Sequence, residues 1–344
     1  MKKIRIRDLS GSELEVAFKE AGIEPYRSRQ VFRWLYRAAV RSFDEMTDLP
    51  ASMRVLLNSK FCISSPEILD LRKSLSDGTT KYLFKLDDGN TVEAVLLPER
   101  ERSTICLSSQ VGCKFACSFC ASAPFGFVRN LTQGEILDEV IAIKNANPGI
   151  SINNIVFMGI GEPFDNYDNV MRAIRVFNDK DAFNIGARKI TISTCGVVPG
   201  MEKLAKEGLQ VELSVSLHSA NDEVRSKLLP VNKRYPLKDL MSACKKYINT
   251  TNRIITFEYV LIKGVNSSRS DALELIKLLK GIKCKVNAIA YNKIQGSPYE
   301  EPTDSETKIF MSTLSDGGVN AMHRKPKGED IDAGCGQLRI SRLK

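Results

Sequence analysis

The chain has 344 residues, of which 43% are hydrophobic, 26% charged and 7% aromatic, a globular composition that excludes disorder, collagen and coiled coil as descriptions of the whole. No stretch approaches the roughly 18 uncharged apolar residues that a membrane helix needs. The formal net charge is +9, which favours a polyanionic partner, and the N-terminus lacks the apolar region of a secretory signal, so we expect a cytoplasmic protein.

Residues 1–60 are expected to form helices. Ser12 with Glu15 resembles a capping box, and residues 29–39 are amphipathic and hold the only tryptophan, Trp34. This segment contains twelve Lys or Arg and eight Asp or Glu, and residues 321–344 contain six and three. Nucleic acid is the commonest polyanion, so we expect the N-terminal segment to dock folded RNA through its phosphates.

A β-hairpin is predicted next, with strands at residues 81–86 and 91–97. From residue 103 short β-rich runs alternate with helical segments. Strands are expected at residues 103–108, 153–158, 189–194, 211–217, 254–262 and 285–291. Helices are expected at residues 132–147, 167–180, 200–207, 236–250 and 268–280. Thr132 with Glu135 should cap the first of these helices, and Gly208 and Gly281 should follow two others.

Six strands that alternate with helices predict a parallel sheet with right-handed crossovers, either open or curled into an incomplete barrel. Both arrangements place ligands at the C-terminal ends of the strands. A further helix (304–315) and a strand (319–324) lead into a glycine-rich segment at 328–336. We therefore divide the chain into a helical N-terminal domain (1–60), a β-hairpin linker (61–100), a partial barrel (101–300) and a C-terminal extension (301–344).

Cys113, Cys117 and Cys120 lie within eight residues, on the loop predicted after the first barrel strand. The chain has nine cysteines, an odd number, and shows no export signal, which argues against a disulfide framework and for metal or redox chemistry. Structural zinc usually takes four protein ligands, and no second C-x-x-C pair is present. Three thiolates suit a [4Fe–4S] cluster with one iron free to bind a ligand. Structural zinc and three unligated thiols are the alternatives.

The spacing of these three cysteines, with Phe119 before the last, resembles the signature of radical S-adenosylmethionine (SAM) enzymes. In that family SAM chelates the open iron and is cleaved to a 5′-deoxyadenosyl radical. The second barrel strand ends in Gly-Ile-Gly-Glu-Pro, which resembles the family's motif for the SAM amino group, and polar residues end other strands. These positions predict a SAM site formed by Gly161, Glu162, Ser193, Ser216, Leu217, His218 and Asn292.

Longer sequence motifs indicate which family of radical SAM enzymes this chain resembles. TICLSSQVGC, GFVRNLTQGEI, FMGIGEP, ISTCGVVP, SLHS and GEDIDAGCGQL occur in this order, and the chain from about residue 25 to residue 338 resembles the RlmN/Cfr family of radical-SAM RNA adenine methyltransferases, most closely its RlmN branch. The resemblance implies an incomplete (β/α)6 radical-SAM barrel that methylates C2 of an adenosine in 23S rRNA, with tRNA as a second candidate substrate. It also implies one [4Fe–4S] cluster, two SAM molecules per turnover and a flavodoxin- or ferredoxin-like electron donor. Nothing in the sequence demands more than a monomer.

Cys335 and Cys106 receive separate roles from this resemblance. Cys335 lies between two glycines, in a backbone that suits a reactive thiol, whereas Cys106 lies in a strand, where a lone cysteine is commonly a packing residue. In the family, the cysteine matching Cys335 accepts a methyl group from one SAM, and the radical from a second SAM activates that group for addition to adenine. The cysteine matching Cys106 then attacks the Cys335 sulfur, and the resulting disulfide releases the product. Glu93 matches the family's general base; a solvent-facing strand carboxylate is the alternative.

Other functions are open at this stage. The Cfr branch methylates C8 and gives ribosomal antibiotic resistance, an RNA-binding protein with structural zinc would be no enzyme, and another radical-SAM enzyme, such as a glycyl-radical activase, would leave Cys335 unexplained. The chain departs from the family at residues 122–124, 291–293 and Gly334, where the extra glycine is expected to loosen the Cys335 loop. The remaining cysteines are predicted to serve packing: Cys62, Cys195, Cys244 and Cys284.

Overall fold

The structure is a computed structural model that describes residues 3–99, 102–294 and 296–338. Its N-terminal lobe contains the helices α1 (Gly11–Glu20), α2 (Tyr26–Tyr36) and α3 (Ala51–Lys60), the 3-10 turns η1 (Ile6–Asp8) and η2 (Phe43–Glu45), and the parallel strands β1 (Ile4–Arg5) and β2 (Phe61–Cys62). The predicted helical cap is wrong by two residues. The capping box of α1 is formed by Ser10 and Glu13, because the helix begins at Gly11.

A ten-stranded sheet forms the body of the molecule, in the order β14-β13-β12-β11-β10-β9-β6-β5-β4-β3. Neighbouring strands are parallel from β14 to β6 and antiparallel from β6 to β3. Within the described residues, β14 and β3 are the free edges, so the sheet is an incomplete barrel. The strands are β3 (Glu67–Lys73), β4 (Thr80–Lys85), β5 (Thr91–Pro98), β6 (Ser103–Cys106), β9 (Ile152–Phe157), β10 (Ile190–Thr194), β11 (Glu212–Ser216), β12 (Ile255–Leu261), β13 (Cys284–Ala290) and β14 (Ala321–Arg324).

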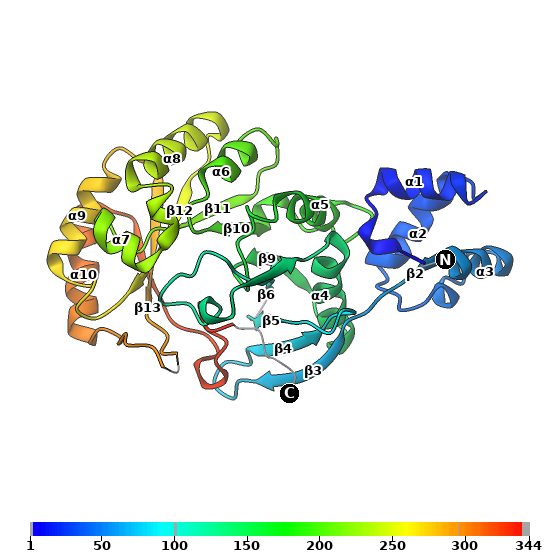
Figure 1. The fold of residues 1–344 in the computed structure, drawn as a ribbon, viewed down its shortest axis with the longest axis horizontal. Helices are drawn as coiled ribbons and strands as arrows, with labels where there is room; N and C mark the ends of the chain where they lie inside the picture. Colours follow the sequence, from blue (N-terminus) through cyan, green and yellow to red (C-terminus); the bar gives the residue numbers. More distant parts are fainter. Residues whose placement is uncertain (1–2, 100–101, 295, 339–344) are drawn as a thin grey trace.

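Helices connect the parallel strands and cover the outside of the sheet (Figure 1). They are α4 (Gln133–Ala146), α5 (Tyr167–Asn178), α6 (Val198–Leu204), α7 (Asp222–Leu228), α8 (Leu237–Thr251), α9 (Arg269–Leu279) and α10 (Asp304–Asp316). Every predicted barrel strand and helix is present, and Thr132 with Glu135 caps α4 as expected. Gly281 follows α9 with a φ of 78°, but Gly208 lies beyond the end of α6 and does not terminate it directly. No described helix is long and apolar enough to cross a membrane.

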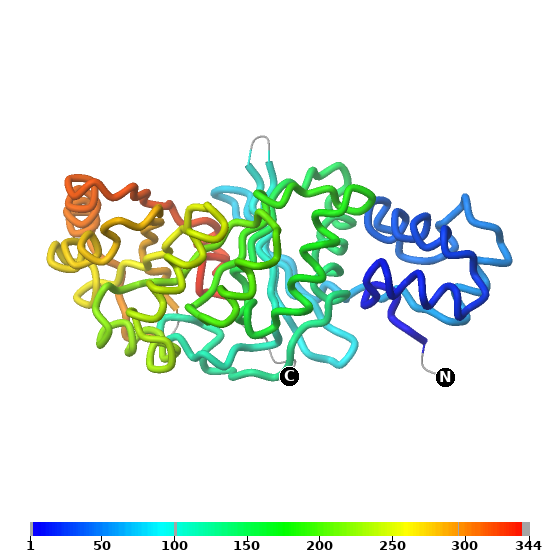
Figure 2. Tube along the Cα trace, turned by 90° about the horizontal axis from the view of Figure 1, so that it is seen from above, coloured from blue at the N-terminus to red at the C-terminus, as the bar shows by residue number. Residues whose placement is uncertain are grey.

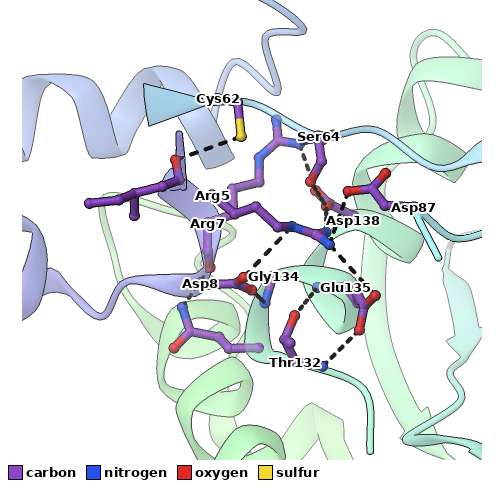
Figure 3. Close-up of polar contacts among 12 residues, drawn as sticks. Arg5, Arg7, Asp8, Cys62, Ser64, Asp87, Thr132, Gly134, Glu135 and Asp138 are labelled. Atoms are coloured by element: carbon purple, nitrogen blue, oxygen red, sulfur yellow. Dashed lines mark hydrogen bonds and ion pairs between the residues drawn. The ribbon is translucent and has the colours of Figure 1, made fainter. Parts of the chain in front are cut away.

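The N-terminal lobe is joined to the barrel by a buried ionic cluster along α4 (Figure 3). Arg7, only 1% exposed, donates to Asp138 Oδ1 at 2.6 Å and to the carbonyl oxygens of Ser64 and Val40 at 2.9 and 2.8 Å. Arg5 adds ion pairs to Asp138 at 3.5 Å and Glu135 at 3.6 Å. Figure 2 shows the lobe at one end of an elongated molecule, so these contacts determine how it is oriented toward the barrel.

Arg7→Met should therefore destabilise the lobe. Removing one partner of a buried ion pair leaves Asp138 buried without its closest cation, which costs about 3–5 kcal/mol. The single tryptophan, Trp34, lies in α2 and reports on this lobe during urea unfolding. Arg33→Met is the matched control, because Arg33 is 56% exposed in its pair with Asp181, and such pairs contribute less than about 1 kcal/mol. If both substitutions lowered the free energy of unfolding by the same amount, this role of Arg7 would be contradicted.

Candidate functional site

A pocket opens at the C-terminal ends of the barrel strands, where the parallel sheet is expected to bind ligands. Residues from five strand ends, from the cysteine loop and from the C-terminal segment surround it. The predicted site residues that line it are Cys113, Cys117, Cys120, Gly161, Glu162, Ser193, Ser216, His218 and Cys335. Leu217, Asn292, Cys106 and Glu93 lie outside the lining but contact residues that form it or support it, as described below.

The three cysteines lie on a loop between the short antiparallel strands β7 (Gln110–Gly112) and β8 (Phe127–Asn130). The loop is held on two sides. On one side the amide of Ser118 donates to the carbonyl of Leu228 in α7 at 2.9 Å, and on the other the amide of Ala121 donates to the carbonyl of Gly336 at 2.7 Å. The barrel and the C-terminal segment thus position the thiols together.

These thiols suit a cationic ligand that accepts thiolate sulfur. Burial raises the pKa of Cys113 to about 12, raises the pKa of Cys120 and raises the pKa of Cys117 well above its usual value, and the neighbouring thiols add to the rise for Cys113 and Cys117. Bound iron would compensate the negative charge that burial disfavours. In the described part of the chain no group of His, Cys, Asp or Glu is arranged to hold a single metal ion; the cysteines instead line the wall of the larger pocket.

Gly161 and Glu162 form the turn that follows β9. Gly161 has a φ of 105°, and a Cβ there would lie 2.7 Å from the Gln110 side chain, so only glycine fits. Glu162 is 3% exposed, and its two carboxylate oxygens accept hydrogen bonds from the amides of Phe164 at 3.0 Å and Cys195 at 2.8 Å. These bonds fix the carboxylate at the pocket wall, where each oxygen retains a lone pair for an ammonium group.

The ends of β10 and β11 supply further parts of the pocket wall. Ser193 and Ser216 line the pocket, whereas Leu217 is fully buried beneath it. Burial lowers the pKa of His218 to about 3, so the ring is neutral. Its Nδ1 accepts a hydrogen bond from the amide of Val260 at 3.0 Å, which leaves the ring proton on Nε2 as a donor. His218 therefore presents a fixed tautomer at this wall.

The C-terminal segment brings Cys335 to the pocket. Asn292 donates from Nδ2 to the Cys335 carbonyl at 3.1 Å, and Ser122 Oγ donates to the Leu338 carbonyl at 2.7 Å. A Cβ at Gly334 would lie 2.7 Å from the Asn292 side chain, so glycine permits close packing here and is not simply a source of looseness. Two of the departures noted in the sequence, Ser122 and Gly334, thus lie at contacts that hold this segment.

Cys106 packs against the segment that carries Cys335, although it does not line the pocket. It is 9% exposed and packs with Val95, Ala333 and Leu338, so the C-terminal segment covers it. Burial raises the pKa of Cys106, and the negative charge of Cys335 adds to the rise. Cys335 is itself exposed, although desolvation by its surroundings also raises its pKa. All nine cysteines are free, so the expected Cys106–Cys335 disulfide is not present.

Glu93 is buried on β5, which rejects the solvent-facing alternative for its side chain. In the sheet register Val95 pairs with Cys106, and Glu93 lies two residues away on the same face of β5. Lys81 Nζ lies 3.6 Å from Glu93 Oε1 and donates to the Asp332 carbonyl at 3.0 Å. Lys81 therefore links Glu93 to the segment that carries Cys335.

Besides Lys81, two charged residues at the pocket were missed in the sequence. Glu258 lines the pocket from within β12; Ser214 and Asn287 donate to its Oε1, while Oε2 has no hydrogen-bond partner in the described structure. Arg225 is fully buried in α7 behind the pocket wall. Charged residues inside a strand and on a short helix usually face solvent, so only the tertiary contacts reveal them.

Comparisons with known proteins agree with this geometry. The model of the radical SAM superfamily matches residues 107–279, and that of the ribosomal RNA large subunit methyltransferase N-terminal domain matches residues 4–63. The chain is 45% identical over 339 residues, 98% of both chains, to a probable dual-specificity RNA methyltransferase RlmN of Thermoanaerobacter sp., and 44% identical over 338 residues, again 98% of both, to one of Clostridioides difficile. A crystal structure of a radical SAM methyltransferase from Sphaerobacter thermophilus superposes with a TM-score of 0.93 and 43% identity, covering 97% of this chain and 99% of that one.

Proposed function

The chain belongs to the RlmN family of radical-SAM RNA methyltransferases, and from this premise we propose that it methylates C2 of an adenosine in 23S rRNA and in tRNA. Its relatives are named as dual-specificity RNA methyltransferases, which supports two RNA substrates. The observation that carries the proposal is the meeting of the three-cysteine loop, the Gly161–Glu162 turn and Cys335 around one pocket. Such substrates imply activity in the cytoplasm.

The family uses a [4Fe–4S] cluster and SAM. Here Cys113, Cys117 and Cys120 would hold the cluster, and the strand-end residues that line the pocket would bind SAM: Gly161, Glu162, Ser193, Ser216 and His218. Leu217 and Asn292, which were also expected to contact SAM, lie outside the lining and would support this site instead, Asn292 through its bond to the Cys335 carbonyl. When bound, the cluster and SAM supply a one-electron reservoir and the 5′-deoxyadenosyl radical, which takes a hydrogen atom from a methyl group. The pocket wall excludes water from this chemistry because Phe115, Phe119, Leu229 and Val260 line it.

Cys335 is the methyl carrier in this proposal. Its sulfur would attack the methyl carbon of a first SAM: a Cys335 S–CH3 bond forms, the bond between that carbon and the SAM sulfur breaks, S-adenosylhomocysteine leaves and the thiol proton is released. After one hydrogen atom has been removed from that methyl group, the methylene carbon on Cys335 bonds to C2 of the adenine. This route suits C2, which is an electron-poor amidine carbon and a poor nucleophile toward SAM.

Glu93 and Cys106 complete the transfer. The adduct radical must lose one electron, which the oxidised cluster would accept, and the proton at C2, which the Glu93 carboxylate accepts; Lys81 balances the charge of Glu93 in the buried setting. Cys106 then attacks Cys335 Sγ: an S–S bond forms, the S–C bond breaks, and the carbon takes a proton to become the methyl group. An external thiol reductant must reduce the disulfide before the next turnover. A flavodoxin- or ferredoxin-like protein is the proposed electron donor, and the enzyme is proposed to act as a monomer.

Nucleoside mass spectrometry of ribosomal RNA and tRNA tests this function. Cells with the protein should contain 2-methyladenosine in both RNA classes, and cells without it should lose this nucleoside or most of it. Synthetic 2-methyl and 8-methyl standards distinguish the two positions. A protein-dependent 8-methyladenosine would instead assign the chemistry of the Cfr branch, and an unchanged methyladenosine profile would reject RNA adenine methylation.

A further inference from the structure

Arg225 is a buried cation whose hydrogen-bond acceptors in the described structure include no carboxylate. Its side chain is 0% exposed, and its guanidinium donates to Asn232 Oδ1 at 2.6 Å and to the carbonyl oxygens of Cys195, Ser216 and Leu217 at 2.8, 3.0 and 3.1 Å. All four acceptors are neutral. In the part of the chain that the structure describes, Arg225 forms no ion pair; the Asp222 carboxylate is connected to it through the Asn232 side chain and also acts on its charge through space.

Arg225 also lies behind the cysteine loop. Its helix, α7, ends at Leu228, whose carbonyl accepts hydrogen bonds from the amide of Ser118 at 2.9 Å and from its hydroxyl at 3.4 Å. Cys117, the residue before Ser118, packs against the apolar cluster that contains Leu228 and Leu229. Arg225 also donates to the carbonyl of Cys195 at 2.8 Å, and Cys195 belongs to the same apolar cluster against which Cys117 packs. A buried cation is therefore placed near one ligand of the proposed cluster.

Such a cation stabilises whichever state of its neighbour carries more negative charge, and it does so most strongly where water is excluded. A cluster held by three thiolates becomes more negative by one unit when it is reduced, and charge and hydrogen bonding around iron–sulfur clusters determine their reduction potentials. We propose that Arg225 is a positioning residue that raises the reduction potential of the [4Fe–4S] cluster by holding a buried charge without an ion-pair partner near Cys117. The inference rests on the cluster assigned under the proposed function.

The hydrogen bonds of Arg225 also hold the ends of two strands in place, and this structural effect can be separated from the effect of its charge. They bind the carbonyl ends of β10 and β11, next to the residues expected to contact SAM. A lysine at this position keeps the charge but lacks the planar fork that reaches several carbonyls at once. Arg225→Met removes both the charge and the hydrogen bonds, whereas Arg225→Lys removes most of the hydrogen bonds but keeps the charge. Comparing the two variants therefore separates the effect of the charge from that of the hydrogen bonds.

The test is a redox titration of the cluster in the purified full chain, reconstituted without oxygen and followed by electron paramagnetic resonance in the absence of SAM. Arg225→Met should shift the reduction equilibrium at least about tenfold toward the oxidised state, which is 59 mV for a one-electron couple. Arg225→Lys should shift it less than about threefold, because the charge remains. Arg234→Met is the matched control, since Arg234 is an exposed arginine on the same connection, and it should leave the equilibrium unchanged.

Iron and sulfide content is measured for every variant, so that potentials are compared only between loaded proteins. If Arg225→Met does not fold, Arg225→Gln, which keeps a donor toward the carbonyls, replaces it under the same criteria. The proposal is overturned if Arg225→Met or Arg225→Gln, fully loaded with cluster, has the reduction potential of the wild type. It is also overturned if Arg225→Lys shifts the reduction potential as much as Arg225→Met does. The proposed function fails in a different way: the wild-type chain would take up no cluster or produce no methyladenosine.

Discussion

Cys335→Ala is expected to abolish RNA methylation, with a loss of at least about 10³-fold in the rate of product formation. Alanine has no sulfur to accept the methyl group, and the mechanism offers no second acceptor. The substitution leaves the C-terminal segment anchored, because the contacts from Asn292, Ala121 and Ser122 are made to the backbone carbonyls of Cys335, Gly336 and Leu338. A loss of activity therefore reports on the thiol itself.

The measurement is methyladenosine formed on a ribosomal RNA fragment with SAM and a chemical reductant. Formation of 5′-deoxyadenosine should persist in the variant, because the cluster ligands and the SAM contacts are unchanged. Cys284→Ala is the matched control, since Cys284 is a half-buried thiol at the start of β13, away from the pocket lining, and it should retain normal activity. Undiminished methylation by Cys335→Ala would eliminate the methyl-carrier mechanism.

The order of barrel elements could be predicted because each carries a local signal. Strands such as Ile255–Leu261 are rich in β-branched and aromatic residues, and α4 begins with a capping box. Strand β3 was missed because its sequence, EILDLRK, is charged and mostly exposed, as is typical of the edge of a sheet. Helix α7 was missed because seven residues provide little periodicity.

The residues of the candidate site also divide into those with a local sequence signal and those without one. The cysteine loop and the Gly161–Glu162 turn are contiguous motifs, so their spacing predicts their chemistry before any contact is known. Lys81, Arg225 and Glu258 have no motif, and their positions depend on partners far along the chain, such as Asp332 for Lys81. The burial of a charge is decided by such partners. Sequence patterns therefore identify the ligands of the site more readily than the groups that set its electrostatics.

Cys106 is both a buried packing residue and the proposed resolving thiol. As a lone strand cysteine it was first expected to be a packing residue, and the structure does bury it, against Val95, Ala333 and Leu338. Two of these partners belong to the segment that carries Cys335, so the packing also determines which thiol lies next to it. Burial raises the pKa of Cys106, which keeps the thiol protonated and unreactive until the proposed adduct forms nearby.

Cys106→Ala should consequently trap the reaction instead of only slowing it. Without the resolving thiol, the bond between Cys335 Sγ and the transferred carbon has no partner to break it, so RNA should stay covalently attached to the protein. A single turnover should produce a protein–RNA species that migrates slowly in a denaturing gel and disappears with ribonuclease, while released methyladenosine falls by at least about 10²-fold. Because alanine is smaller than cysteine, the packing with Val95 and Leu338 loses one sulfur atom and the fold should be retained.

The double variant Cys106→Ala/Cys335→Ala is the decisive control. It keeps the same change at Cys106 but removes the attachment point, so the slow species must be absent if the link runs through Cys335. If the species persists in the double variant, RNA is attached at another residue. If Cys106→Ala releases methylated RNA at the wild-type rate, Cys106 is only a packing residue and the disulfide step is wrong. In the proposed mechanism Cys335 therefore acts before Cys106. Loss of Cys335 prevents the covalent protein–RNA adduct from forming, and loss of Cys106 prevents that adduct from being released.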